Sequence, residues 1–238
     1  MIKLENTVLP SPEQWKAIIR GMRNPMNSWD KSDSEIKYEN IRHGGYIDIG
    51  PNDHELMTKL AKAGSDHSKY RRMIVVYVDI TAPLYWWKEF DTYKVGTVAN
   101  SCSTMHKIHE KKFTEEDFSM ENLSERIGIE LDFPDPDNEA LPFSSRNIIE
   151  FTIDTLNVFR DLYNNATDSE SKKVYWDNMI QLLPSSYNQR RTVMFNYQVL
   201  ANIYPSRKNH KLQEWHDFCD WIKSLPYSEL ITMEEKLC

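Results

Sequence analysis

Residues 73–90 read MIVVYVDITAPLYWWKEF, and this stretch says most about the fold. Residues 73–80 are rich in β-branched side chains and almost continuously apolar, which is typical of a β-strand. The Ala82-Pro83 pair ends that strand, because proline has no backbone N–H to donate to a neighbouring strand. The residues that follow, Leu84–Phe90, fit a short helix rich in aromatic side chains. The stretch therefore predicts a fold that combines sheet and helix.

Two helices are predicted before this strand. The first begins after Ser11, a favourable helix cap, with proline at its first position. It buries the apolar residues that recur at helical spacing up to its end, which are Trp15, Ile18, Ile19 and Met22. The second is capped by Asn52 or Asp53 and ends at Gly64. Residues 21–50, rich in Gly, Asn, Ser and Asp, predict mostly loop.

The C-terminal third predicts a succession of helices. They run from Ser144 or Ser145 onward, from Asp168 to near Pro184, from Gln189 to Tyr204 and from Leu212 to Leu225. Residues 128–143 predict an irregular loop, because prolines interrupt them, and residues 134–142 are a candidate linker at which we do not divide the fold. The sequence thus predicts one α+β domain over residues 1–238.

The composition restricts the partners and the location of the protein. The net charge is −7, whereas a nucleic-acid binder usually carries a basic surface, so we expect no nucleic-acid polymer as partner. No apolar run approaches the roughly 20 residues that span a bilayer, and the first residues lack the layout of a secretory signal. Cys102, Cys219 and Cys238 are widely spaced, without the pairing of a zinc site. These features predict a reduced, cytoplasmic protein without a metal centre and without a membrane partner.

A segment of small and hydroxyl residues, from Glu89 to Thr104, is the first candidate for ligand binding. Backbone N–H groups and hydroxyls can approach an anion closely there, and Lys94 supplies a positive charge. Cys102 lies within the segment, but no feature of the sequence indicates an activated thiol. The alternative is an ordinary polar turn, since loops of small residues are common.

A cluster of cations follows Pro205. The residues from Ser206 to Lys211 include Arg207 and lead into the last predicted helix. Cations do not stabilise the start of a helix, whereas an anionic ligand there would contact both the cations and free backbone N–H groups. The cluster therefore predicts an anion site, and the alternative is a solvated basic turn.

The predicted helix from Gln189 to Tyr204 carries the third candidate. One of its faces is apolar, and the opposite face carries the polar residues Arg191, Gln198 and Asn202. Together with Asn196 at the edge of the apolar face, these amides could pair with the donors and acceptors of a planar heterocycle. The alternative is a solvated helix face.

The order of these features resembles the flavin-dependent thymidylate synthases. In that family a strand ends in Ala-Pro, a short aromatic helix follows, and an Arg-His-Arg motif leads into a serine-rich loop. Here the helix after Ala82-Pro83 leads without a gap to Thr92-Tyr93-Lys94, which stands in the place of Arg-His-Arg. Asn100 and Ser103 keep the Asn-x-x-Ser spacing of the family after a one-residue insertion. The resemblance covers roughly residues 10–230.

This resemblance implies an enzyme, a methyltransferase that converts dUMP to dTMP in nucleotide biosynthesis. Reduced FAD would supply hydride, methylenetetrahydrofolate the one-carbon unit, and NADPH the electrons for the flavin. The resemblance also implies a homotetramer with a central antiparallel or mixed sheet and with flavin sites between subunits. Because the cofactor carries the hard chemistry, no catalytic triad or pair of carboxylates needs to appear in the sequence.

The same resemblance implies roles for individual residues. Arg207 matches the arginine that contacts the uracil ring and assists its ionisation, so it is the implied catalytic residue. The implied FAD-binding residues are His67, Ser68, Tyr93, Lys94, Val95, Asn196, Asn202 and Lys211. The implied nucleotide-binding residues are Glu89, Asn100, Ser101, Cys102, Ser103, Thr104 and Arg207.

The chain departs from the family at several cations. Thr-Tyr-Lys at residues 92–94 removes two strong donors, and lysine is a point charge where arginine presents a planar fork. Gln198 replaces another arginine, and Ile180-Gln181 stands near the arginine that holds the nucleotide phosphate. Each lost cation weakens anion binding by about 1.5–3 kcal/mol. Besides the enzyme, two hypotheses therefore stay open: a non-catalytic or substrate-shifted homologue that binds flavin or nucleotide, and a structural oligomer with an empty site.

Overall fold

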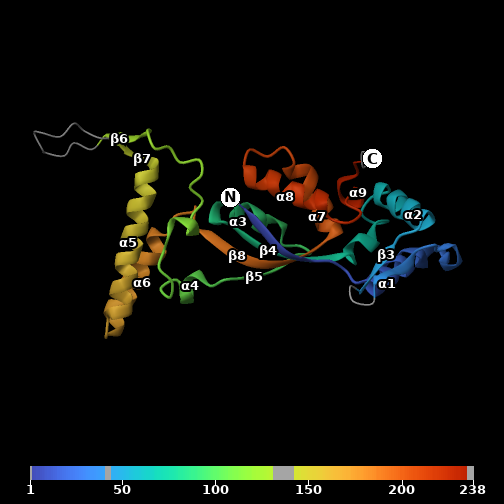
Figure 1. The fold of residues 1–238 in the computed structure, drawn as a ribbon, viewed down its shortest axis with the longest axis horizontal. Helices are drawn as coiled ribbons and strands as arrows, with labels where there is room; N and C mark the ends of the chain where they lie inside the picture. Colours follow the sequence, from blue (N-terminus) through green and yellow to red (C-terminus); the bar gives the residue numbers. More distant parts are fainter. Residues whose placement is uncertain (1, 41–43, 131–141, 235–238) are drawn as a thin grey trace, which may run out of the picture. The chain divides into compact units, whose positions relative to one another are not determined.

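The computed structural model describes residues 2–40, 44–130 and 142–234 (Figure 1). Helices and strands both occur among them, which confirms the predicted α+β class. By its internal contacts the chain divides into two compact units, each built from more than one segment of the sequence. Unit 1 comprises Thr81–Glu89 and Ser101–Arg190, and unit 2 comprises Ile2–Ile80, Phe90–Asn100 and Arg191–Cys238. The single domain expected over residues 1–238 stays a prediction.

Unit 2 contains the longer sheet. In chain order its elements are β1 (Lys3–Val8), α1 (Pro12–Arg23), the 3₁₀ turns η1 (Asn24–Met26) and η2 (Trp29–Lys31), β2 (Glu35–Asn40), β3 (Gly44–Asp48), α2 (Pro51–Lys62), η3 (Lys69–Arg72), most of β4 (Val75–Pro83), η4 (Asp91–Tyr93), most of β5 (Val98–Ser101), most of β8 (Asn188–Asn196), α7 (Tyr197–Arg207), α8 (Gln213–Ser224) and α9 (Glu229–Thr232). Four strands pair in the order β1-β4-β8-β5, and β2 pairs with β3 in a separate hairpin (Figure 1).

The strand predicted over residues 73–80 is β4. Its residues Val76, Val78 and Ile80 are completely buried, while Tyr77 between them is exposed, so one face of the strand belongs to the core. The next strand in the sheet, β8, presents Phe195 to α8, where the ring lies 5.8 Å from that of Phe218. Burial of such large aromatic side chains is the main force that holds α8 on the sheet.

Unit 1 is mostly helical. Its elements are most of α3 (Leu84–Phe90), α4 (Thr104–Lys107), η5 (Glu115–Asp117), β6 (Gly128–Glu130), β7 (Pro142–Ser144), α5 (Ser145–Asn165) and α6 (Ser169–Leu182). A core packs between α5, α6 and the preceding loop, and its buried residues are Ile108, Phe113, Phe118, Met120, Ile153, Leu156 and Met179. The predicted helix starts are confirmed, because Ser144 caps α5 and Asp168 caps α6 through hydrogen bonds to backbone N–H groups.

The loop predicted over residues 21–50 is wrong. After α1, which ends at Arg23, this region contains η1, η2 and the hairpin of β2 and β3, in which Ile36 lies opposite Ile47. The predicted caps of the second helix are also wrong, since α2 begins at Pro51 after Gly50. Asp33 explains the difference, because its carboxylate accepts hydrogen bonds from the first backbone N–H groups of α2, at 2.9 and 3.1 Å.

The helix predicted over residues 189–204 is wrong in its first half. Residues 188–196 form β8, in which Val193 and Phe195 are buried, whereas Met194 between them is half-buried and Thr192 before them is exposed, a period of two that argues for a strand. The helix α7 begins only at Tyr197, where Asn196 acts as its cap. Pro205 lies within the last turn of α7 and does not end it.

The irregular loop predicted over residues 128–143 is wrong at its ends. Residues 128–130 pair with residues 142–144 as the short antiparallel strands β6 and β7. The candidate linker over residues 134–142 lies outside the described residues except for Pro142.

Candidate functional site

The predicted catalytic arginine lies in a small aromatic cluster of unit 2. Arg207 donates a hydrogen bond from Nε to the hydroxyl of Tyr93, at 2.8 Å. Its guanidinium carbon lies 4.5 Å from the centre of the Trp215 ring and 5.4 Å from that of Tyr93. A hydrogen bond in the plane of the guanidinium and an aromatic ring beside it together fix the orientation of this cation.

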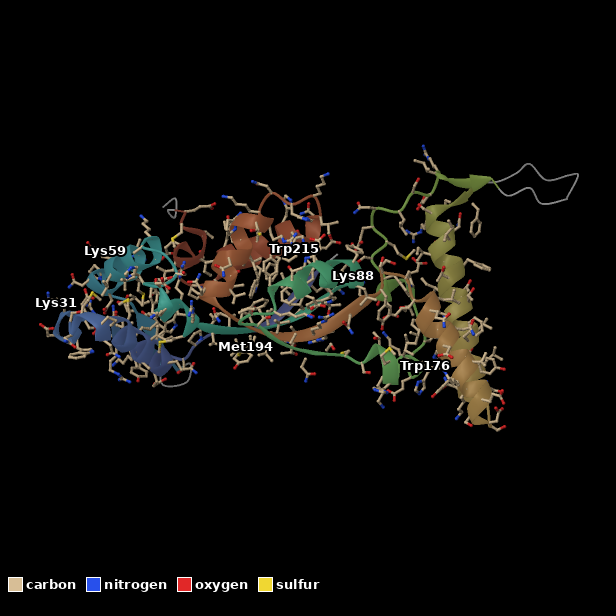
Figure 2. All side chains as sticks on the ribbon, turned by 180° about the vertical axis from the view of Figure 1, so that it is seen from behind. Lys31, Lys59, Lys88, Trp176, Met194 and Trp215 are labelled. Atoms are coloured by element: carbon tan, nitrogen blue, oxygen red, sulfur yellow. The ribbon has the colours of Figure 1, made fainter. Side chains whose placement is uncertain are left out.

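Three elements bring this cluster together. Tyr93 is the last residue of η4, Arg207 is the last residue of α7, and Trp215, which Figure 2 labels, lies in the first turn of α8. Trp215 is completely buried, and its ring meets that of Tyr93 edge to face at 6.2 Å. Arg207 is half-buried. The cluster therefore has a rigid inner wall, and part of the cation remains accessible.

Arg207 and Lys208 lie at a different helix end from the one predicted. Arg207 ends α7, and α8 begins at Gln213 with Leu212 as its cap. A cation at the C-terminus of a helix interacts favourably with the helix dipole. The prediction that these cations stand at a helix N-terminus is thus wrong for Arg207 and for Lys208, the C-cap of α7. It is right for Lys211, which directly precedes the cap of α8.

The altered triplet at residues 92–94 is nevertheless next to Arg207. Tyr93 is its direct partner, and Lys94 follows Tyr93 at the surface. The turn continues to Gly96, whose φ of +85° favours glycine, and a Cβ at Gly96 would come within 2.8 Å of the Val199 side chain. The triplet and the end of α7 therefore form one site within unit 2.

The predicted amides of this region are engaged within the protein. Asn196 accepts a hydrogen bond from the backbone of Val199 at 3.0 Å and donates one to the carbonyl of Gly96 at 3.3 Å. Gln198, predicted on a solvated face, is 8% exposed. Its amide accepts from Ser68 at 2.9 Å and donates to Asn202 at 3.1 Å. Asn202 itself lies at the surface.

Arg71 is a residue that the sequence did not suggest. It is 4% exposed, and it donates to the hydroxyl of Ser68 at 3.0 Å and to the carbonyl of Leu230 at 2.9 Å. Burial lowers the pKa of Arg71 from its usual value, because a charged group is poorly solvated in the interior. Together with Gln198 it makes a buried polar network behind the surface that carries Asn202.

The other predicted flavin-binding residues are at the surface of unit 2. His67, Lys94 and Lys211 are exposed, and Val95 has 92% of its surface accessible. Of the predicted residues, the geometry thus joins Arg207 to Tyr93, and Ser68 to Asn202 by way of Gln198.

Most of the predicted nucleotide-binding residues belong to unit 1. Glu89 is half-buried near the end of α3, Ser101 ends β5, and Ser103 caps the short helix α4 through the backbone of His106. Cys102 is exposed, and its backbone N–H and carbonyl bond to Arg190 and to the Gln189 side chain, at 2.9 and 3.0 Å. Thr104 begins α4, while Asn100 in β5 belongs to unit 2. The polar segment is therefore ordered by β5 and α4 and is more than a turn.

Among the described residues no group of three His, Cys, Asp or Glu side chains could hold a metal ion. None of the helices in the described ranges is long and apolar enough to cross a membrane.

Comparison with known proteins supports the fold over the full chain. The sequence matches no model of a protein family and no curated protein. Two crystal structures of thymidylate synthase X (ThyX) from Helicobacter pylori, with FAD and dUMP, do match. One has a TM-score of 0.60 at 17% identity and covers 98% of this chain and 97% of that chain. The other has a TM-score of 0.61 at 19% identity, with 98% of each chain covered. This chain has the ThyX fold.

A third similar structure broadens the comparison. PolB, a UMP/dUMP methylase from Streptomyces cacaoi bound with 5-Br dUMP, matches with a TM-score of 0.55 at 12% identity, covering 98% of this chain and 94% of that chain. The ThyX fold is therefore found in enzymes with more than one named nucleotide substrate. At these identities the likeness concerns the fold, and the roles of single residues rest on the geometry described above.

Proposed function

We propose that this protein is an enzyme that binds FAD and transfers a one-carbon unit to the pyrimidine ring of a deoxyuridine nucleotide such as dUMP. One observation carries the proposal: Tyr93, in the place of the Arg-His-Arg motif, holds the guanidinium of Arg207. The ThyX fold is the second support, since the ThyX structures were solved with FAD and dUMP. Methylenetetrahydrofolate as carbon donor, NADPH as reductant and a cytoplasmic location belong to the same proposal.

The residues around Arg207 fit FAD in the chemistry of their donors. FAD carries a diphosphate and a flat ring with amide-like groups. The exposed cations Lys94 and Lys211 suit the diphosphate, and the exposed amide of Asn202 suits the ring edge. The turn that carries Lys94 packs closely on α7, because Gly96 has no Cβ to meet the Val199 side chain. When bound and reduced, FAD would supply the hydride.

The chain itself would supply orientation and charge. With its plane fixed by Tyr93 and Trp215, Arg207 can donate to a pyrimidine carbonyl without reorganising during the reaction. Negative charge that develops on the ring as its carbon attacks the donor would be stabilised by this guanidinium. Lys94 would stay near the flavin as a mobile point charge, in contrast to the planar fork of an arginine. A proton released from the ring would leave to solvent through the exposed side of the cluster.

The test is the Arg207→Ala variant, assayed for dTMP with dUMP, FAD, methylenetetrahydrofolate and NADPH. We expect the flavin spectrum to remain and product formation to fall at least about a hundredfold, the scale of losing one donor to developing charge. The matched control is Lys208→Gln, which removes a neighbouring exposed cation whose ion pair is with Glu234. Full activity of Arg207→Ala would refute the assigned role.

A second function is favoured by the altered triplet. With Thr-Tyr-Lys at residues 92–94, the site has fewer strong donors, so the protein could bind flavin and nucleotide without catalysis or act on another uridine nucleotide. PolB, which has a similar fold, is named for both UMP and dUMP. Growth of a thymidine-requiring strain that carries the gene would exclude the non-catalytic protein. Assays with UMP in place of dUMP would identify a changed substrate.

We further propose that the protein is a homo-oligomer, in keeping with a tetramer, and that α5 forms one of its contacts. Exposed apolar residues line one face of α5 at alternating spacings of three and four with Thr155 between them, and they are Ile148, Phe151, Val158 and Leu162. This spacing is that of a helix seam, and a second copy supplies an identical, self-complementary helix. Phe151→Glu should lower the mass measured by sedimentation, whereas Asp154→Asn should not. An unchanged mass in Phe151→Glu would exclude this contact.

A further inference from the structure

A pocket of about 290 Å³ lies in unit 2 beside α1, on residues that the proposed reaction does not use. Its polar and aromatic lining residues are Lys16, Arg20, Arg23, Trp29, Ser32 and Ser34. Lys16, Arg20 and Arg23 are spaced four and three residues apart, so they share one face of α1. The turn η2 and the residues after it supply the facing wall.

The charges of this pocket are unbalanced. Lys16 and Arg20 are exposed and have no ion pair with any residue that the structure describes. Like charges four residues apart repel one another on a helix, so their placement is unfavourable for α1 alone. The dipole of α1 accounts for cations in its last turn, but Lys16 lies too far from that end. A bound anion would turn the repulsion into attraction.

A third cation lies at the base of the pocket. Arg23 is 3% exposed and donates from Nε to Asp53 at 2.5 Å and from Nη1 to the carbonyl of Ser28 at 3.2 Å. Its Nη2 atom is buried and has no hydrogen-bond partner among the described residues. A buried guanidinium nitrogen without an acceptor is costly, and it is a group that an anionic ligand could satisfy after a small movement.

The facing wall is held firmly in place. Asp53 is completely buried and accepts hydrogen bonds from the hydroxyls of Ser32 and Ser34 at 2.8 and 2.6 Å. Trp29 donates from its indole nitrogen to Asn24 at 2.8 Å, yet half of its surface is exposed. The indole is thus an oriented, accessible aromatic surface next to the cations, and large exposed aromatic residues of this kind commonly mark binding sites.

We propose that this pocket binds a small aromatic phosphate ester, with the ring against Trp29 and the phosphate between Lys16 and Arg20. A phosphate accepts several charge-assisted hydrogen bonds and suits a fork-shaped arginine donor beside a lysine. The ring requires a flat apolar partner, which Trp29 provides. The net charge of −7 makes general attraction of anions by this protein unfavourable, so the local pocket must supply the affinity.

The experiment is a titration of the full-length protein with phenyl phosphate, phenol, benzoate and inorganic phosphate, followed by NMR or calorimetry. We expect saturable binding of phenyl phosphate, weaker binding of inorganic phosphate and benzoate, and none of phenol. Arg20→Gln should weaken phenyl phosphate binding about tenfold or more, the scale of one charge-assisted hydrogen bond. Trp29→Ala should bring phenyl phosphate down to the affinity of inorganic phosphate.

A control variant separates this pocket from other cations. Lys62→Gln removes an exposed cation at the end of α2, so it should leave phenyl phosphate binding unchanged. Lys16→Gln provides a second exposed position if Arg20→Gln lowers the melting temperature. The proposal is overturned by absent saturation, by equal binding of phenyl phosphate and inorganic phosphate, or by an equal loss in Lys62→Gln.

Discussion

Two arginines of unit 2 are held in contrasting ways. Arg23 is almost completely buried and forms an ion pair with the fully buried Asp53. Arg207 is half-buried and is held by the hydroxyl of Tyr93 and by the face of Trp215. The first arrangement balances a charge inside the protein, whereas the second orients a cation and leaves part of it accessible. Removal of the partners should therefore cost stability at Arg23 and activity at Arg207.

The largest effect is expected at the buried ion pair. Asp53→Ala leaves the Arg23 charge buried without its carboxylate, so the free energy of unfolding should fall by about 3–5 kcal/mol. Urea denaturation followed by circular dichroism measures this change. The control Asp30→Ala alters an exposed aspartate of η2 and should change stability by less than about 0.5 kcal/mol. If the free energy of unfolding fell by less than about 1 kcal/mol in Asp53→Ala, the ion pair of Arg23 would not be a main source of stability, and this contrast with Arg207 would fail.

Acid should weaken the same pair. Burial by itself raises the pKa of Asp53, but hydrogen bonds from Ser34 and Ser32 and the bond and charge of Arg23 outweigh it, so the pKa lies below its usual range. A depressed carboxylate pKa stabilises the fold above the unfolded-state pKa of about 3.9, and this part is lost as the pH falls through the folded value. Unfolding free energies measured between neutral pH and pH values below about 4 should fall more steeply in the wild type than in Asp53→Asn. Parallel curves would contradict this contribution.

The intermediate effect is expected at Arg207 and concerns activity. Arg207→Lys keeps a positive charge but loses the planar fork that Tyr93 and Trp215 orient. The activation free energy of dTMP formation should rise by about 1.5–3 kcal/mol, so the rate constant should fall. The melting temperature should change little, because Arg207 is half-buried and Lys retains much of its chain packing. If Arg207→Lys lost much stability but kept normal specific activity, Arg207 would serve stability, as Arg23 does, and not activity.

Local patterns in the sequence predicted much of the fold. The helix at Ser11, the strand ending near Pro83 and the helix after Ser144 are all found, because caps, periodicity and proline act within a few residues. The prediction of one helix over residues 189–204 was wrong for a physical reason. Read alone, the apolar residues of this stretch fit both the helical period and the strand period of two. Residues 188–196 form a strand because β8 pairs between β4 and β5 in the sheet. Asn196, a good helix cap within the run, was the signal that could have marked the boundary.

The sequence predicted the central cation of the candidate site, but few of the residues that surround it. Arg207 was singled out by the cluster of cations after Pro205, its catalytic role came from the resemblance, and it lies beside Tyr93 although 114 residues separate the two in sequence. Trp215 was not predicted as a partner, and neither were the buried Arg71 and the Arg23–Asp53 pair. Contacts of this kind depend on how distant elements pack, which no local pattern of the sequence specifies. The assignment of Arg207 and Lys208 to the wrong helix end has the same origin.

The smallest effect is expected at the hydroxyl of Tyr93. Tyr93→Phe keeps the ring near Arg207 and removes the acceptor of the 2.8 Å hydrogen bond from Nε. Catalysis should lose about 0.5–1.5 kcal/mol, less than in Arg207→Lys, because Trp215 still orients the guanidinium. Tyr93→Ala removes the ring as well and should cost more, so the two variants separate the hydrogen bond from the packing. If Tyr93→Phe loses as much activity as Arg207→Ala, the hydroxyl does more than position Arg207. It would then act directly on the substrate.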